Sequence, residues 1–376
     1  MSEATTCPTT EYDVAVIGGG MLGSAFAWGL SRAGQRCIVF DEGDNAIRTA
    51  RGNFGLVWVQ SKGEGMPAYA GWSLKASQLW PNFASELRER TGLDVSYVRG
   101  GFDIAANESD LERSTARLRR IEAELGPGAY AYSILDQAEL KAEIPEVGNV
   151  PGATYTEHDG HCNPLILLRA MHQDLQALGG IYRPNAPVSE AKPLAGGGFE
   201  ILGMGGKTMA RAEKVIVAAG HGSQALAEPL GLDLPIHPDQ GQVLVTEKVA
   251  PILHHATSGV RQTDSGAFLL GPSSKTIGLD TRTDHETLAS IAHRCMTIFP
   301  FLATLRLQRT WAALRVMTPD GCPVYQQSVQ YPGAFSFACH SGVTLAACHA
   351  LEVSQWVIDG AIPQSYDAFH PRRFHV

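Results

Sequence analysis

The sequence lacks several features that would place it at once in a functional class. Its seven cysteines are scattered and none forms a CxxC pair, which indicates reduced thiols and predicts no iron–sulfur, zinc or other metal site in the chain. Lys and Arg number 30 against 38 Asp and Glu, so the basic excess that nucleic-acid binding requires is missing. No apolar run is long enough for a transmembrane segment, and no signal-peptide pattern precedes residue 12. We therefore expect a cytoplasmic protein.

Residues 12–42 carry the most informative pattern that is present. An apolar run rich in β-branched residues ends at Gly18, Gly20 and Gly23, an apolar-periodic segment follows, and a second apolar run ends at Asp41. In such a strand–helix–strand unit the glycines make the turn, admit a pyrophosphate to the backbone and let the helix pack on the strand. A terminal carboxylate accepts the hydroxyls of an adenosine ribose and repels a 2′-phosphate. The pattern predicts binding of FAD or NAD rather than NADP.

The remaining patterns predict two interleaved domains. A second buried strand, 214–220, ends in Gly220 and is typical of the same nucleotide-binding sheet. Residues 234–309 read as alternating strands followed by a helix, which indicates an antiparallel sheet. We predict an α/β protein with a discontinuous Rossmann-like FAD-binding domain and an α+β substrate-binding domain. The FAD-binding domain comprises 1–90, 146–233 and 319–376, and the substrate-binding domain comprises 91–145 and 234–318.

Three motifs together resemble the D-amino-acid oxidase superfamily of FAD enzymes. They are the glycine turn near the amino end, the Ala-Ala-Gly at 218–220, and a strand followed by Cys-His-Ser-Gly at 339–342. Within that superfamily, the segments 51–65, 156–164 and 311–324 most resemble the β subunits of bacterial opine oxidases of the octopine and nopaline types. Hydroxyproline and sarcosine dehydrogenase β subunits resemble them next.

The resemblance implies where noncovalent FAD is held. A helix amino end at Gly342 would lie under the flavin pyrimidine, where N–H dipoles stabilise negative charge during catalysis. The expected contacts are Gly18, Gly20, Gly23 and Asp41 with the ADP half, Asn53 and Gly55 with the pyrophosphate and ring, Val188 with the adenine through its backbone, Gly220 with the dinucleotide, and His340, Ser341, Gly342, Val343 and Thr344 with the flavin.

The resemblance also implies a reaction. Arg315 would bind the carboxylate of the substrate through two parallel hydrogen bonds, although an arginine in this position could instead be paired with a nearby acid. Arg261 would bind a second carboxylate, as an opine requires; the alternative is a solvated hairpin residue. We expect hydride transfer from a secondary amine such as an opine to FAD. The resulting imine would be split by water into a 2-oxo acid and an amino acid, with no acid–base side chain required.

Two departures from the superfamily bear on the mechanism, and a third bears on the local backbone at position 339. Leu269 stands where oxidase relatives carry a lysine that promotes reaction with oxygen, and Ala313 where they carry a cysteine that binds FAD covalently. Cys339 replaces a glycine. We expect a dehydrogenase that passes electrons to partners: an α subunit and a small iron–sulfur γ subunit, with FMN at the α/β contact in some relatives. An acceptor at the membrane would make the enzyme peripheral to it.

Other interpretations stay open from sequence alone. The substrate could be D-hydroxyproline, proline or sarcosine, the cofactor could be NAD in an NAD-dependent dehydrogenase, and the chain could be a non-catalytic scaffold that binds FAD. His158 and His161 flank Asp159 and Gly160, and this spacing predicts a turn rather than a metal site.

Overall fold

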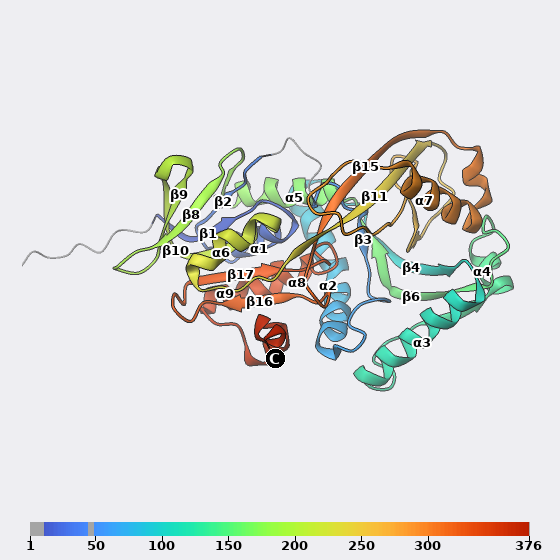
Figure 1. Ribbon diagram of the computed structural model, residues 1–376, viewed down its shortest axis with the longest axis horizontal. Coiled ribbons are helices and arrows are strands. Elements are labelled where there is room, and N and C mark those ends of the chain that lie inside the picture. The colour runs from blue at the N-terminus through green and yellow to red at the C-terminus, as the bar shows by residue number, and fades with distance from the viewer. Residues whose placement is uncertain (1–10, 44–48, 376) are drawn as a thin grey trace, which may run out of the picture.

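The computed structural model describes residues 11–43 and 49–375, and two lobes follow one another along its long axis (Figure 1). One lobe is built on a mixed sheet whose central strands are parallel, in the order β16-β17-β10-β1-β2-β7, with β9 on β10 and β8 on β9. The strands are β1 (Tyr12–Ile17), β2 (Cys37–Phe40), β7 (Ile181–Arg183), β8 (Val188–Pro193), β9 (Phe199–Gly203), β10 (Thr208–Val217), β16 (Val324–Gln327) and β17 (Ala334–Ala338).

The central strand β1 is apolar and buried from Val14 to Ile17 because both faces of its sheet are covered there. Val14 and Val16 pack with Phe26 of helix α1 (Met21–Arg32), whereas Ala15 and Ile17 face a separate core on the other side. The helical elements of this lobe are α1, α2 (Pro67–Thr91), α5 (Pro164–Ala177), α6 (Ser223–Ala227), α8 (Ala346–Cys348), a π-helical segment (His349–Val353) and α9 (Ser354–Asp359).

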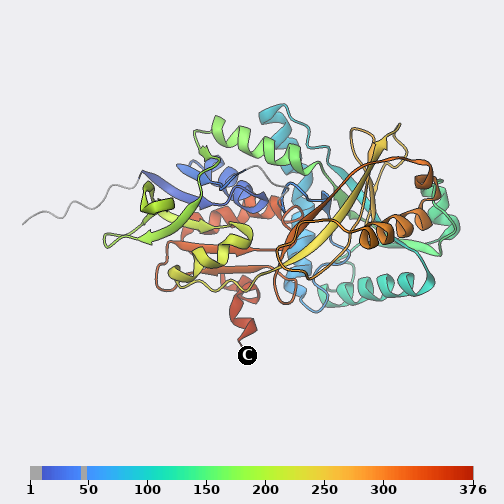
Figure 2. The ribbon, with the colours of Figure 1, turned by 45° about the horizontal axis from the view of Figure 1, so that its top comes forward.

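The other lobe combines two smaller sheets, seen from a second direction in Figure 2. One contains β3 (Leu56–Val57), β4 (Val98–Ala105), β5 (Ser133–Asp136), β6 (Gly152–His161) and β12 (Ala256–Thr257). The other is antiparallel, in the order β13-β14-β11-β15. Its strands are β11 (His237–Lys248), β13 (Val260–Gln262), β14 (Ala267–Leu270) and β15 (Leu307–Met317), and the helices of the lobe are α3 (Glu108–Leu125), α4 (Gln137–Glu143) and α7 (His285–Ile298).

A shared core joins these two sheets to α7. Phe102 of β4, Phe268 of β14 and Ile291 of α7 are all buried in one cluster. Short 3₁₀ segments complete the fold: Met204–Gly206, Gly220–Gly222, Glu228–Leu230, Pro300–Thr304, Gln364–Phe369 and Pro371–Phe374.

The architecture confirms the predicted fold class, a Rossmann-like lobe beside an α+β lobe with an antiparallel sheet. The domain boundaries stay a prediction. The sequence placed the segment that contains β6 in the FAD-binding domain, but β6 pairs with β4 of the other lobe rather than with the parallel sheet. The predicted turn at Asp159–Gly160 is wrong: both residues continue strand β6. Glycine is required at 160 because a Cβ there would lie 2.4 Å from the Val98 carbonyl oxygen of the paired strand.

Candidate dinucleotide and substrate site

The glycine turn joins β1 to α1 at the carboxyl edge of the parallel sheet. Gly18 has φ +107°, and a Cβ there would lie 2.3 Å from the carbonyl oxygen of Ala218. A Cβ at Gly23 would lie 1.8 Å from the Gly18 carbonyl oxygen. Because β1 and β10 pair in parallel with Ile17 opposite Val217, the end of β10 and Gly220 lie beside this turn. The two strongest nucleotide-binding motifs in the sequence are therefore adjacent in the fold.

The first turn of α1 is suited to phosphate. Asn107, Asp136, Asn163 and Asp284 cap α3, α4, α5 and α7 with side-chain hydrogen bonds, but the cap of α1 is Gly20, which offers none. A Cβ at Gly20 would meet only the Ala50 Cβ, at 3.9 Å. The N–H groups of this turn are thus available to an anion, and the helix dipole favours one.

Asp41 lies at the same turn, as the sequence pattern requires. Its Oδ2 accepts from the Gly19 N–H at 2.8 Å and its Oδ1 from the Gly43 N–H at 3.0 Å. Val188, expected at the adenine, opens β8 and is partly buried against the cluster that contains Ile17 and Phe40. These residues fit the adenosine half of a dinucleotide.

Asn53 and Gly55 form a tight loop that leads into β3. The Asn53 Oδ1 accepts from the Gly55 N–H at 2.7 Å, and Gly55 has φ +90° with the Cys162 carbonyl oxygen 2.4 Å from its would-be Cβ. Arg261 supports this loop from behind, since its Nε donates to the Phe54 carbonyl oxygen at 2.8 Å. Arg261 is only 4% exposed, so it is not a solvated hairpin residue.

Residues 340–344 pack directly on the glycine turn. A Cβ at Gly342 would lie 3.0 Å from Leu22 of α1, and Ser341 shares a hydrogen bond of 2.5 Å with the Tyr69 hydroxyl. The Thr344 hydroxyl accepts from the Trp58 N–H at 3.0 Å. Helix α8 begins only at Ala346, so Gly342, Val343 and Thr344 form the turn that precedes it. The fold thus brings the amino-terminal and carboxyl-terminal motifs together.

Arg315 lies on β15 opposite Asp239 of β11, and the two side chains form an ion pair. The Arg315 Nη1 donates to the Asp239 Oδ2 at 2.5 Å, while the Asp239 Oδ1 accepts from the Ser274 hydroxyl at 2.6 Å. The guanidinium lies over Gly241, where a Cβ would be 2.6 Å from Nη2. The alternative considered from sequence, an Arg315 paired with a nearby acid, is therefore present as the Arg315–Asp239 ion pair. It uses Nη1, and 23% of the side chain stays exposed.

Lys62 was not among the residues expected at the site. Its ammonium donates to the Nδ1 of His340 at 3.2 Å. Desolvation, followed by repulsion from Arg315, lowers the pKa of Lys62 to about 8. Lys62, then burial, then Arg315 hold the pKa of His340 well below its usual range, so the imidazole is neutral. Lys62 therefore contacts His340, and Arg315 lies near enough to act on the pKa of both, from three segments of the chain.

The loop that carries Lys62 is fixed from below by Asp159. This buried carboxylate accepts from the Val59 N–H at 2.5 Å, from the Gln60 N–H at 3.3 Å and from the Gln60 side-chain amide at 2.7 Å. A Cβ at Gly63 would lie 2.1 Å from the Ala70 nitrogen, so the residue after Lys62 must be glycine. In the sequence, Lys62 is marked only by its place before Gly63 and shortly after an apolar run, which does not by itself indicate a site residue.

Comparison with known proteins settles the family. The model of the family described as DAO, FAD dependent oxidoreductase, matches residues 13–356. The chain belongs to the DAO family of FAD-dependent oxidoreductases. The resemblance seen in the sequence is thereby confirmed, as is FAD over NAD.

Individual relatives of this DAO-family enzyme match over nearly its whole length. The B subunit of opine oxidase from Agrobacterium tumefaciens (strain Ach5) is 39% identical over 97% of this chain and 98% of its own length. The B subunit of opine oxidase from Rhizobium meliloti is 38% identical over 97% and 98%. The crystal structure of glycine oxidase from Geobacillus kaustophilus superposes with a TM-score of 0.82 at 25% identity, covering 95% of this chain and 96% of that one.

Two positions that the sequence predicts to differ from oxidase relatives lie in the antiparallel sheet. Leu269 is buried in β14 opposite Val245 and Arg261, within an apolar cluster that includes Trp311. Ala313 lies in β15 opposite Gly241. Neither side chain can donate a proton or form a bond to a cofactor.

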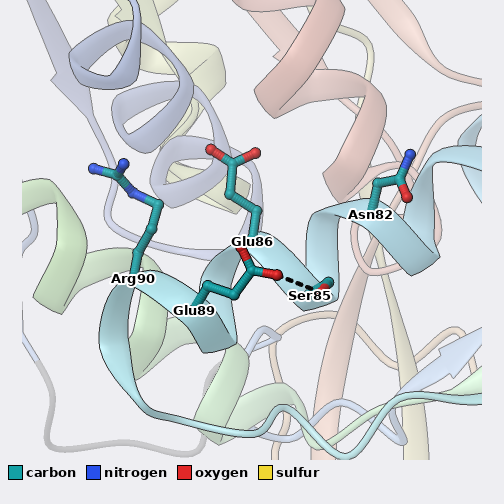
Figure 3. Close-up of a pocket in the computed structure, with 5 residues that line it drawn as sticks. All are labelled: Asn82, Ser85, Glu86, Glu89 and Arg90. Atoms are coloured by element: carbon teal, nitrogen blue, oxygen red, sulfur yellow. Dashed lines mark hydrogen bonds between the residues drawn. The ribbon is translucent and has the colours of Figure 1, made fainter.

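A hollow elsewhere on this DAO-family enzyme does not form a site of reaction. Figure 3 shows it on α2, lined by Asn82, Ser85, Glu86, Glu89 and Arg90. Two of its charged residues are already paired, Glu86 with Arg32 and Arg90 with Asp174, and Glu89 accepts from the Ser85 hydroxyl. Among residues 11–43 and 49–375, no helix is both long and apolar enough to cross a membrane, and no group of three His, Cys, Asp or Glu side chains is placed to hold a metal ion.

Proposed function

We propose that this enzyme oxidises the C–N bond of a secondary amine that carries a carboxylate, and that the amine is an opine of the octopine or nopaline type. The observation that carries the proposal is the position of Arg315 on β15, where its guanidinium stays partly exposed and its charge acts on Lys62 and on His340, which precedes the turn packed on α1. The two opine oxidase relatives, 39% and 38% identical, support the choice of an opine.

The chain's own residues bind and orient the substrate. The carboxylate accepts hydrogen bonds from the Arg315 atoms that Asp239 leaves open, which fixes the neighbouring Cα–H bond in one direction. The Ser274 hydroxyl donates to the other oxygen of the Asp239 carboxylate that pairs with the guanidinium. Noncovalently bound FAD supplies the two-electron acceptor. The N–H groups of the turn at 342–344 are placed to favour negative charge beside it.

The route by which electrons leave is part of the proposal. Leu269 offers no cation to promote reaction with oxygen, so the enzyme acts as a dehydrogenase and passes electrons to partners. Both opine oxidase relatives are named as one subunit of their enzyme, which supports an assembly of several chains. We infer an α subunit and a small iron–sulfur γ subunit, with FMN at the α/β contact.

Anaerobic titration of the yellow holoenzyme tests the function. Octopine or nopaline is expected to bleach the flavin absorbance fully, and proline and sarcosine to bleach it slowly or not at all. Activity with oxygen as sole acceptor is expected to be far below that with an artificial dye. Bleaching by proline or sarcosine alone would replace the opine with a cyclic or N-methyl amino acid, and no bleaching across the panel would favour a scaffold.

Arg315→Lys tests the residue that carries the proposal. Lysine keeps the charge but cannot form the bidentate pair of hydrogen bonds. We therefore expect kcat/KM for the amine that reduces the flavin to fall about 30-fold, which corresponds to about 2 kcal/mol. Arg309→Lys is the matched control, because Arg309 is exposed on the same strand. Equal activity of the two variants would remove Arg315 from the substrate site.

A further inference from the structure

Two cations lie close to the neutral His340. Lys62, from the loop after β3, donates to the His340 Nδ1 at 3.2 Å, and the charge of Arg315, from β15, also lowers the pKa of His340. Asp239 neutralises Arg315. Within the described chain, no carboxylate lies within ion-pair distance of the Lys62 ammonium, which makes its hydrogen bond to the neutral His340. The site therefore holds an unneutralised positive charge that favours an anion.

The surroundings of Lys62 explain why this charge persists. The ionisable groups that face it are Arg315 from β15, Cys339 and His340 after β17, Asp159 from β6 and Cys322. Burial raises the pKa of the Cys339 thiol to about 12 and that of Cys322 to about 11, so both are neutral. Burial also raises the pKa of Asp159, whose oxygens are occupied by Val59 and Gln60. With a pKa of about 8, Lys62 is mostly an ammonium at neutral pH.

We propose that Lys62 binds the second carboxylate of a dicarboxylate amine whose first carboxylate is bound by Arg315. This inference rests on the proposed function and specifies its substrate class. In an opine, two carboxylates sit on carbons attached to the same nitrogen, so their spacing suits two cations that lie near one another. As an ammonium, Lys62 acts as an anion anchor, because only its neutral form could accept a proton.

Arg261 is placed less favourably for this task. Its Nε is committed to the Phe54 carbonyl oxygen, and it lies on β13, at the opposite edge of the sheet from β15. Three strand spacings of about 4.8 Å put the two backbones roughly 14 Å apart. The guanidinium of Arg261 is buried against Gly55 rather than directed at Arg315.

Binding of two unreactive ligands to the holoenzyme tests the assignment. Thiodiacetate and (methylthio)acetate differ by one carboxylate and contain sulfur in place of the nitrogen, so neither has a C–N bond to oxidise. Isothermal titration calorimetry is expected to show at least about tenfold tighter binding of thiodiacetate to the wild type. In Lys62→Met this preference should fall to near unity, while the affinity for (methylthio)acetate stays unchanged.

Two further variants complete the test. Lys62→Arg restores the charge and is expected to recover most of the preference. Lys207→Met removes an exposed lysine and should leave the preference as in wild type. A preference that survives in Lys62→Met, or equal weakening of both ligands, would overturn the inference, as would a changed flavin reduction potential with an unchanged preference. The anaerobic opine titration is read separately: failure there with the preference intact would point to another dicarboxylate amine.

Discussion

At the scale of single residues, the arginine proposed to bind substrate is already paired with an acid. Arg315 forms its ion pair with Asp239, 76 positions away in sequence. A partly buried guanidinium is costly to leave without an anion. Asp239 therefore stabilises the empty site, and at the same time it competes with a substrate carboxylate for the same cation.

Asp239→Asn is expected to separate these two effects. The variant leaves Arg315 without its anion, so the free energy of unfolding should fall by about 1–3 kcal/mol. Because the competing carboxylate is gone, (methylthio)acetate should bind several-fold more tightly. Chemical denaturation and calorimetry measure the two quantities, and Asp280→Asn, in an ion pair with Arg282 within its own exposed loop, is the control. Weaker ligand binding together with lower stability would mean that Asp239 positions Arg315 rather than competing with substrate.

The residues that could be predicted from sequence differ in kind from those that could not. Gly18, Gly23 and Asp41 follow from a local motif, because one strand, one turn and one helix determine their positions. Lys62 and Asp159 depend on contacts between β3, β6 and the end of β17, which no local spacing reveals. Arg315 could be singled out only through resemblance, and its partner only through the β11–β15 register.

At the scale of elements, the amino end of α1 separates the requirements of folding from those of cofactor binding. Gly23 is needed for packing, since a Cβ there would lie 1.8 Å from the Gly18 carbonyl oxygen. Gly20 has open space around it and φ −74°, which any residue adopts. Folding alone would therefore tolerate a side chain at Gly20, whereas a pyrophosphate lying on the turn would not.

Gly20→Ala is accordingly expected to fold normally and to bind FAD poorly. The free energy of unfolding of the FAD-free protein should change by less than about 1 kcal/mol. The dissociation constant for FAD, measured by quenching of flavin fluorescence, should rise at least about tenfold, because the methyl group occupies the path of the pyrophosphate. Gly71→Ala in α2, where a Cβ meets only Leu125 at 3.6 Å, serves as control. Unchanged FAD affinity in Gly20→Ala would place the pyrophosphate elsewhere.

Strand β6 shows where element prediction failed and why. The sequence Glu-His-Asp-Gly-His has the composition of a turn, yet it runs through the strand because pairing with β4 decides its conformation. Gly160 is demanded by the close approach of Val98 rather than by a bend. Asp159 is buried where its oxygens accept hydrogen bonds from Val59 and Gln60, in the loop that carries Lys62. Tertiary contacts here override local preference.

At the scale of the whole molecule, the cofactor site is assembled from segments at both ends of the chain. The glycine turn, the Asn53–Gly55 loop and the turn at 340–344 belong to different parts of the sequence, and helix α1 contacts the carboxyl-terminal helices directly. A ligand that touches all of them binds the folded state alone. Its binding free energy must therefore add to the stability of the fold.

FAD is consequently expected to raise the melting temperature of the FAD-free chain by about 5 °C when present at about 1,000 times its dissociation constant. Such saturation contributes about 4 kcal/mol, and a chain of 376 residues has an unfolding entropy of roughly 0.8 kcal/mol per kelvin. Differential scanning fluorimetry with FAD, FMN and NAD at equal concentration checks this. FMN lacks the adenosine half that we propose Asp41 and the α1 turn receive, so it should shift the transition far less. NAD should do the same because it lacks the flavin that we propose residues 340–344 contact. Equal shifts by FAD and NAD would mean that the carboxyl-terminal turn makes no contact with the ring.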